Sequence, residues 1–128
     1  MKVLALDYGA ARTGVAVSDP TGTLARPLRI LERAASDEGL EELAELVRAE
    51  EADRVVVGLP LTLRGERGSQ AEETERFAER LEAILDVPVE RFDERFTTRL
   101  AGPGGDEDAR AAAHLLTSYL ELSSNRQP

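Results

Sequence analysis

The chain has 128 residues, enough for one domain with its own hydrophobic core. It contains no cysteine, which excludes disulfides and thiolate metal ligands, and no apolar run long enough to cross a membrane. Its first residues read directly as a strand, so we expect no signal peptide or transit segment and predict a cytoplasmic protein. The net charge of −9 argues at first against a nucleic-acid partner, because binding to phosphates requires cations.

The negative charge is concentrated in two segments. Residues 37–54 carry eight acids against two arginines, and residues 71–86 carry six acids against two arginines, so the rest of the chain sums to +1. Both segments are predicted helices, and the excess charge is therefore expected on their solvated faces. Of the 16 basic residues 15 are arginine, which suits bidentate phosphate contacts, although a biased genome composition explains this equally well.

The first part of the chain predicts three strands joined by short loops. Val3–Leu6 is an apolar run typical of a strand buried on both faces, and a turn over 9–14 leads to a second strand starting at Val15. A turn opened by Asp19 separates it from a third strand over 24–31. Short connections between consecutive strands predict an antiparallel meander.

The rest of the chain predicts helices that alternate with strands. A helix capped by Ser36 precedes a buried strand over 54–58. A second helix would be capped by Ser69, with Glu72 as its capping-box partner. The remaining predicted segments are a loop over 59–68, a strand over 87–92, a glycine-rich break at 102–105 and a last helix over 106–122.

This order, βββαβαβα, predicts an α/β fold with a five-stranded mixed sheet and helices packed on it. We expect a single domain over residues 1–122 and a disordered tail over 123–128.

Three acids are candidates for a common site. Asp7 shares a strand face with Val3 and Ala5, so it points the same way as core residues, although it could instead hydrogen-bond the amides of the following turn. Asp108 falls on the helical stripe of Ala112, Leu115 and Tyr119, but local evidence alone favours simple compensation of the helix dipole. Glu94 follows the fifth strand directly.

Together, Asp7, Glu94 and Asp108 would form an oxygen-only site suited to Mg²⁺ or Mn²⁺. Two such ions about 4 Å apart can activate a water and stabilise the leaving oxygen of a phosphodiester. Because the chain has 25 acids, spacing alone does not select this triad.

Four blocks of sequence resemble the YqgF family, also called RuvX-like. They cover nearly the whole chain in the family's order. The blocks are Asp7-Tyr8-Gly9 with Arg12, Gly14, Ala16 and Ser18-Asp19; Val56-Val57-Gly58-Leu59-Pro60-Leu61 with Gly65; Pro88-Val89 with Asp93-Glu94-Arg95-Phe96-Thr97-Thr98 and Ala101; and Asp108 with Ala111-Ala112-Ala113, Leu116 and Tyr119-Leu120.

The resemblance implies an RNase H-like fold and a metal-dependent nuclease with Asp7, Glu94 and Asp108 as its acidic ligands. It implies either maturation of the 5′ end of pre-16S rRNA or resolution of Holliday junctions, in the cytoplasm. The family usually has a longer and often basic connection before its last helix. Here Arg99–Glu107 supplies nine residues with one basic side chain, which predicts a weaker grip on substrate.

Several residues near these blocks are candidates for substrate binding. Arg12 could contact a phosphate or be a surface arginine with no role. Arg64 and Arg67 lie in a glycine-rich loop that could contact substrate or serve as an ordinary connection. Arg95 could pair with Asp93 or approach the scissile phosphate. Thr97 and Thr98 could orient substrate or cap a helix. His114 is expected at the surface.

Three functions compete at this point. The first is a nuclease acting on structured nucleic acid, which as a junction resolvase would need two active sites and thus a homodimer. The second is a phosphatase or kinase of the actin-like type, which shares an Asp-x-Gly hairpin but normally needs two domains. The third is a non-catalytic nucleic-acid-binding module in ribosome assembly, consistent with the acidic charge.

Overall fold

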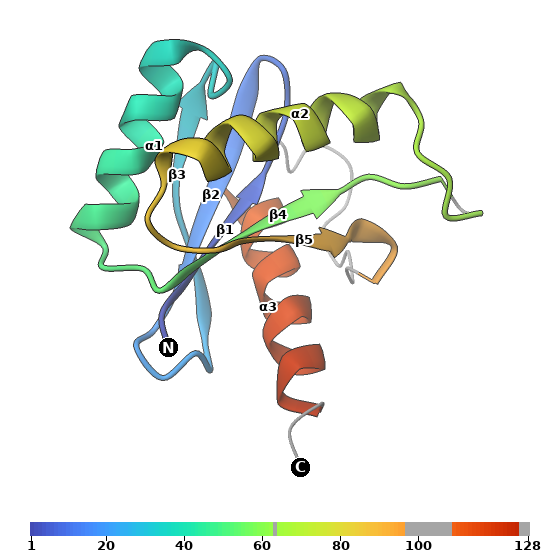
Figure 1. Ribbon diagram of the computed structural model, residues 1–128. Coiled ribbons are helices and arrows are strands. Elements are labelled where there is room, and N and C mark those ends of the chain that lie inside the picture. The colour runs from blue at the N-terminus through green and yellow to red at the C-terminus, as the bar shows by residue number, and fades with distance from the viewer. Residues whose placement is uncertain (63, 97–108, 126–128) are drawn as a thin grey trace.

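The computed structural model of the protein describes residues 1–62, 64–96 and 109–125 (Figure 1). The predicted order of elements is confirmed. The elements are β1 (Val3–Asp7), β2 (Arg12–Ser18), β3 (Ala25–Glu32), α1 (Asp37–Ala49), β4 (Arg54–Leu59), α2 (Ser69–Ile84), β5 (Val89–Asp93), the short 3₁₀ helix η1 (Glu94–Phe96) and α3 (Arg110–Asn125).

The predicted mixed sheet is also confirmed. Its five strands lie in the order β3-β2-β1-β4-β5. The meander β1-β2-β3 is antiparallel, whereas β4 runs parallel to both β1 and β5. β4 follows α1 and β5 follows α2, as expected because a helix must carry the chain back along the sheet before a parallel strand can start.

Helices cover both faces of the sheet (Figure 1). Because side chains alternate along a strand, Leu4 and Leu6 of β1 pack in one cluster with α1 and α2, whereas Val3 and Ala5 pack with α3 in the other. The residues of β4 alternate in the same way, with Val55 and Val57 on the first face. These two cores make the central strands apolar on both sides, which explains their continuous hydrophobic runs.

The parallel strands end at the same edge of the sheet. Asp7 ends β1, Leu59 ends β4 and Asp93 ends β5, with Leu59 opposite Asp93 in the register. The carboxyl ends of neighbouring parallel strands, together with the loops that follow them, are where ligands bind in open α/β sheets.

Some predicted boundaries are wrong. β2 begins at Arg12 rather than Val15, since Arg12 still pairs with Glu32 of β3. Ser69 is the first residue of α2 rather than its cap; extended Gly68 takes the N-cap position, and no side chain bonds there.

The last helix continues past the predicted end at 122 to Asn125, so Ser123–Asn125 belong to α3 and not to the predicted tail. The predicted start of this helix at 106 lies outside the described residues. In the part of the chain that the structure describes, no helix has the length and apolar character of a membrane span.

Candidate active site

Asp7 lies at the end of β1 on the predicted side of the sheet. Its strand neighbours Val3 and Ala5 pack against α3, and Asp7 itself is half-buried. The loop after it turns tightly at Gly9, where a Cβ atom would lie 2.5 Å from the carbonyl oxygen of Arg12. The loop therefore brings the backbone of Arg12 against Gly9, and Gly14 then pairs with Asp7.

Glu94 follows β5 and lies over the neighbouring strand. A Cβ atom on Gly58 of β4 would lie 2.8 Å from Glu94 Oε1 and 3.0 Å from its Cγ. The Glu94 side chain thus crosses β4 at the one position where the strand has no side chain. The absence of a side chain at Gly58 is what admits the carboxylate to this edge of the sheet.

Asp7 and Glu94 line one open cavity of about 540 Å³. They are separated by most of the chain, and the parallel pairing of β1, β4 and β5 brings them together. Arg12 lines the same cavity, as does Ala111 in the first turn of α3. Two carboxylates and one guanidinium that converge on one cavity can bind a cation and a phosphate side by side.

The third predicted ligand, Asp108, lies outside the described residues, and so do Thr97 and Thr98. Asp108 comes three positions before Ala111 in the sequence. Within residues 1–62, 64–96 and 109–125, no group of three or more His, Asp or Glu side chains is placed to hold a metal ion.

Arg95 pairs with Asp93, one of its two predicted roles. Its Nε lies 3.0 and 2.9 Å from the two carboxylate oxygens of Asp93, and its backbone N–H donates to Oδ1 at 2.9 Å. The hydrogen bonds from Arg95 hold the pKa of Asp93 below its usual value. A Cβ on Gly65 would lie 3.3 Å from Arg95 Nη1, so the 60–68 loop passes close to this guanidinium.

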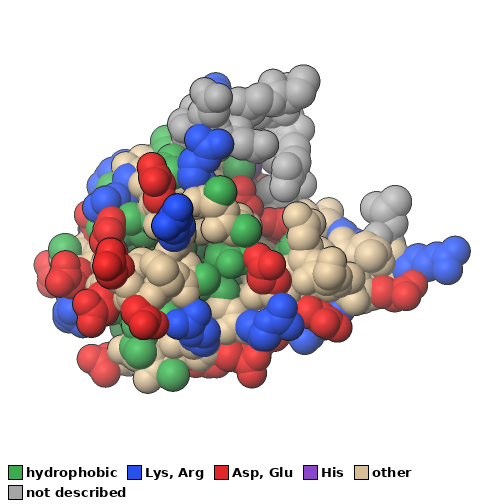
Figure 2. Space-filling view, turned by 90° about the horizontal axis from the view of Figure 1, so that it is seen from above, with side chains coloured by type: hydrophobic (Ala, Val, Ile, Leu, Met, Phe, Trp, Pro, Cys, Tyr) green, Lys and Arg blue, Asp and Glu red, His purple; other side chains and the backbone are tan. Residues whose placement is uncertain are grey.

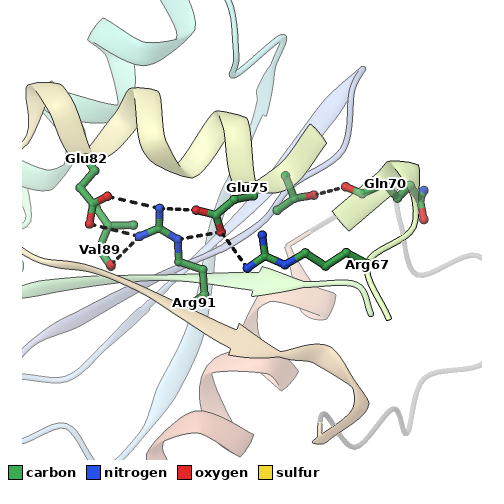
Figure 3. A network of polar contacts seen from close by, with 7 residues as sticks. Arg67, Gln70, Glu75, Glu82, Val89 and Arg91 are labelled. Atoms are coloured by element: carbon green, nitrogen blue, oxygen red, sulfur yellow. Dashed lines mark hydrogen bonds and ion pairs between the residues drawn. The ribbon is translucent and has the colours of Figure 1, made fainter. Parts of the chain in front are cut away.

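Arg67 belongs to an ionic network that joins this loop to α2 and β5 (Figure 3). Its Nη2 lies 4.0 Å from Glu75 Oε1. Glu75 in turn accepts from Arg91 Nη2 at 2.8 Å, and Arg91 also pairs with Glu82 at 3.1 Å. Arg64, the other predicted contact of the loop, is exposed.

The face of the molecule that is seen from above in Figure 2 is electrostatically mixed. Figure 2 shows acidic and basic side chains interspersed among the described residues of this face, without a continuous basic surface.

His114 was predicted to lie at the surface. It is half-buried, whereas Arg110 and Thr117 on the same side of the helix are exposed.

Part of the cavity lining was not predicted from the sequence. Tyr8, Gln70 and Glu73 also line the cavity, the last two from α2. Glu73 is exposed, as predicted for the acids of the second acidic segment, but it also lines the cavity. The available signal was its helical spacing: Gln70 and Glu73 lie three apart, and Phe77, which packs on the sheet, follows four residues later.

Solved structures of low identity share this fold. RuvC from T. thermophilus, in a complex with a Holliday junction substrate, superposes with a TM-score of 0.62 at 16% identity, covering 97% of this chain and 96% of RuvC. A fowlpox virus resolvase bound to Holliday junction DNA gives a TM-score of 0.58 at 13% identity, covering 99% of this chain and all of that one (100%). The domain therefore has the RNase H-like fold.

The chain belongs to the RuvX family. The family model, described as "RuvX: Holliday junction resolvase", matches residues 1–122. This confirms the predicted family, since RuvX and YqgF name the same group.

Curated relatives of the chain are named "Putative pre-16S rRNA nuclease". The relative from Chloroflexus aurantiacus is 48% identical over 96 residues, which is 75% of this chain and 63% of that protein. The one from Syntrophus aciditrophicus is 39% identical over 139 aligned positions, covering 99% of this chain and 93% of its own. The match thus spans somewhat less than two thirds of the Chloroflexus protein and nearly all of the Syntrophus protein.

Proposed function

We propose that this protein is a metal-dependent endonuclease that cleaves phosphodiester bonds in structured nucleic acid, with the 5′ end of pre-16S rRNA as its substrate. The observation that carries the proposal is the cavity shared by Asp7, Glu94 and Arg12. Membership of the RuvX family and the name of the curated relatives support the same reaction. A role in rRNA processing implies a cytoplasmic location.

The donors at this cavity suit a hard divalent cation. Asp7 and Glu94 offer carboxylate oxygens, which Mg²⁺ and Mn²⁺ prefer, and Gly58 leaves room for the Glu94 side chain. Asp7, Glu94 and Asp108 would hold the metal. When bound, it would supply positive charge for the reacting phosphate and a nucleophilic water.

The other residues would position the substrate. Arg12, on the cavity wall, would bind a phosphate oxygen through a charge-assisted hydrogen bond. Arg95 is oriented by Asp93 and would approach the backbone from the η1 turn. Thr97 and Thr98 would orient the strand, and Arg64 and Arg67 would contact flanking phosphates.

Holliday junction resolution is the second candidate. The description of the family favours it, and so does the shared fold with two resolvases. Both substrates present the same phosphate chemistry. A junction resolvase would require a homodimer to cut two strands, so oligomeric state separates the candidates.

The test incubates the purified protein with Mg²⁺ or Mn²⁺ and either a pre-16S rRNA leader, a four-way DNA junction or single strands. Cleavage of the leader that is lost with Asp7→Asn and with Glu94→Gln is the expected result. Cleavage that survives both substitutions would refute the proposed site. Binding without cleavage would support the non-catalytic assembly module, and preferred cleavage of the junction would support the resolvase.

A further inference from the structure

The cavity has a second wall, built by α2 and the residue after Asp7. Gln70 and Glu73 lie three residues apart on α2, so they share one helical face. The helix is anchored below them by Phe77, which is almost fully buried against the sheet. Gln70 lies in the first turn, where Thr74 Oγ1 donates to its carbonyl oxygen at 2.9 Å (Figure 3). This wall is therefore a defined surface rather than a loop.

Tyr8 joins the two walls. Its ring stacks on Phe77 with a centroid distance of 4.4 Å and an interplanar angle of 21°. Burial, followed by the charge of the nearby Glu73 carboxylate, raises the pKa of Tyr8 above its ordinary value. Tyr8, the residue after Asp7, thus lies against α2 and close to Glu73.

The charge of Glu73 decides what this wall can bind. A carboxylate only accepts hydrogen bonds and repels the phosphates of a nucleic acid. Arg12 would bind the phosphate, so the groups of a nucleotide left to face Glu73 are its hydrogen-bond donors. These include the ribose 2′-hydroxyl and the exocyclic amino groups of the bases.

We propose that Tyr8, Gln70 and Glu73 form a nucleoside-binding subsite beside the reacting phosphate, in which Glu73 accepts a hydrogen bond from a nucleotide donor. This inference rests on the proposed nuclease function and adds to it that a nucleoside of the substrate is recognised beside the reacting phosphate. If the donor is the 2′-hydroxyl, Glu73 is the residue that distinguishes RNA from DNA.

The test measures binding rather than cleavage, in an Asp7→Asn background without divalent metal, by fluorescence anisotropy. The probes are three labelled single strands of one sequence: RNA, the matching 2′-deoxy strand, and RNA with inosine in place of guanosine. Glu73→Gln is compared with Glu72→Gln. Glu72 neighbours it on α2 and is exposed like Glu73, but it does not line the cavity. Both variants remove one negative charge.

In the Asp7→Asn parent, the strand that lacks the recognised donor should bind about tenfold more weakly than RNA. Glu73→Gln should reduce this difference to about twofold, and Glu72→Gln should leave it unchanged. Loss of discrimination against the 2′-deoxy strand assigns the ribose hydroxyl, and loss against inosine assigns the base.

Two results would overturn the proposal, and they differ in meaning. Strands that bind well, but with the same ratios in both variants and the parent, would refute the subsite and leave the nuclease proposal standing. Failure of the parent to bind any strand, together with no cleavage by the unmodified protein with Mg²⁺ or Mn²⁺, would refute both.

Discussion

Gly58→Ala should disable the site through one methyl group. The added Cβ would lie 2.8 Å from Glu94 Oε1, 3.0 Å from Glu94 Cγ and 3.1 Å from Leu115 Cδ2. Comfortable contacts between carbon atoms begin near 3.5 Å, so these neighbours must move by about 0.5 Å. Leu115 is 2% exposed and packed in the α3 core, which leaves the Glu94 side chain as the group that yields.

A shift of this size should matter far more for activity than for folding. Overpacking a core position typically costs about 1–3 kcal/mol of the free energy of unfolding. A misplacement of about 1 Å in a catalytic group can cost about a hundredfold in rate, so we expect a ten- to hundredfold loss for Gly58→Ala. Its affinity for Mn²⁺ should fall as well, because Glu94 is a proposed ligand.

The assays are cleavage of the preferred substrate at saturating Mn²⁺, Mn²⁺ binding by calorimetry, and urea denaturation. Val57→Ala is the matched control. Val57 precedes Gly58 on β4, is fully buried and faces the opposite core, so its truncation should cost about 2 kcal/mol without touching Glu94. At a temperature where both variants are folded, only Gly58→Ala should lose activity.

A double-mutant comparison tests whether Gly58 acts through Glu94. Adding Gly58→Ala to Glu94→Gln should cause little further loss of Mn²⁺ affinity, because the group it displaces has already been changed. Unchanged cleavage and unchanged Mn²⁺ affinity in Gly58→Ala alone would refute the reasoning from close approach.

Three further predictions concern other parts of the chain. Replacing Arg64 and Arg67 together by Gln should weaken nucleic-acid binding and make the dependence of log binding constant on log salt concentration shallower by about 1.4 for a single strand. An unchanged slope would mean that neither arginine contacts phosphate. Ser36→Ala removes the hydroxyl that accepts from the Gly39 N–H at 3.0 Å, and it should lower the free energy of unfolding by about 1 kcal/mol in urea denaturation, whereas no change would exclude a stabilising cap. Hydrogen bonds, first from Thr21, lower the pKa of Asp19 from 3.8 to about 2, so the stabilisation by this carboxylate is present above pH 4 and lost as the pH falls towards 2. Asp19→Asn should therefore reduce the change of melting temperature between pH 4 and pH 2. An unaltered dependence of melting temperature on pH would contradict this.

The order of strands and helices was predictable because each element carries its own pattern. Val55–Val57 reads as a strand buried on both sides, and Ser36 marks the start of α1, where its Oγ accepts the Gly39 N–H. The end of α2 was less predictable. Ile84 continues the apolar stripe of the helix, yet its side chain is 46% exposed, because the helical period does not tell where the sheet beneath it stops.

The site was only partly predictable for a related reason. The face of Asp7 follows from alternation along β1, but the role of Gly58 depends on a side chain that arrives from β5, far along the sequence. Glu73 was missed because an acidic helix reads as a solvated one, and only the packing of α2 shows that one of its acids lines the cavity. Close approaches between distant segments are tertiary facts that spacing does not encode.

The net charge of −9 is compatible with a nucleic-acid substrate because of where the acids lie. The two acidic segments contain α1 and α2, which cover the sheet face opposite α3, and several of their acids are paired with arginines, such as Glu42 with Arg29 and Glu75 with Arg91. At about 0.1 M salt, exposed charges more than about 10 Å apart are largely screened from one another. Arg12 lines the cavity itself, where we propose that it contacts a phosphate. The acidic helices should therefore slow the approach of substrate at low salt, whereas the local arginine and the metal decide where the bound strand lies.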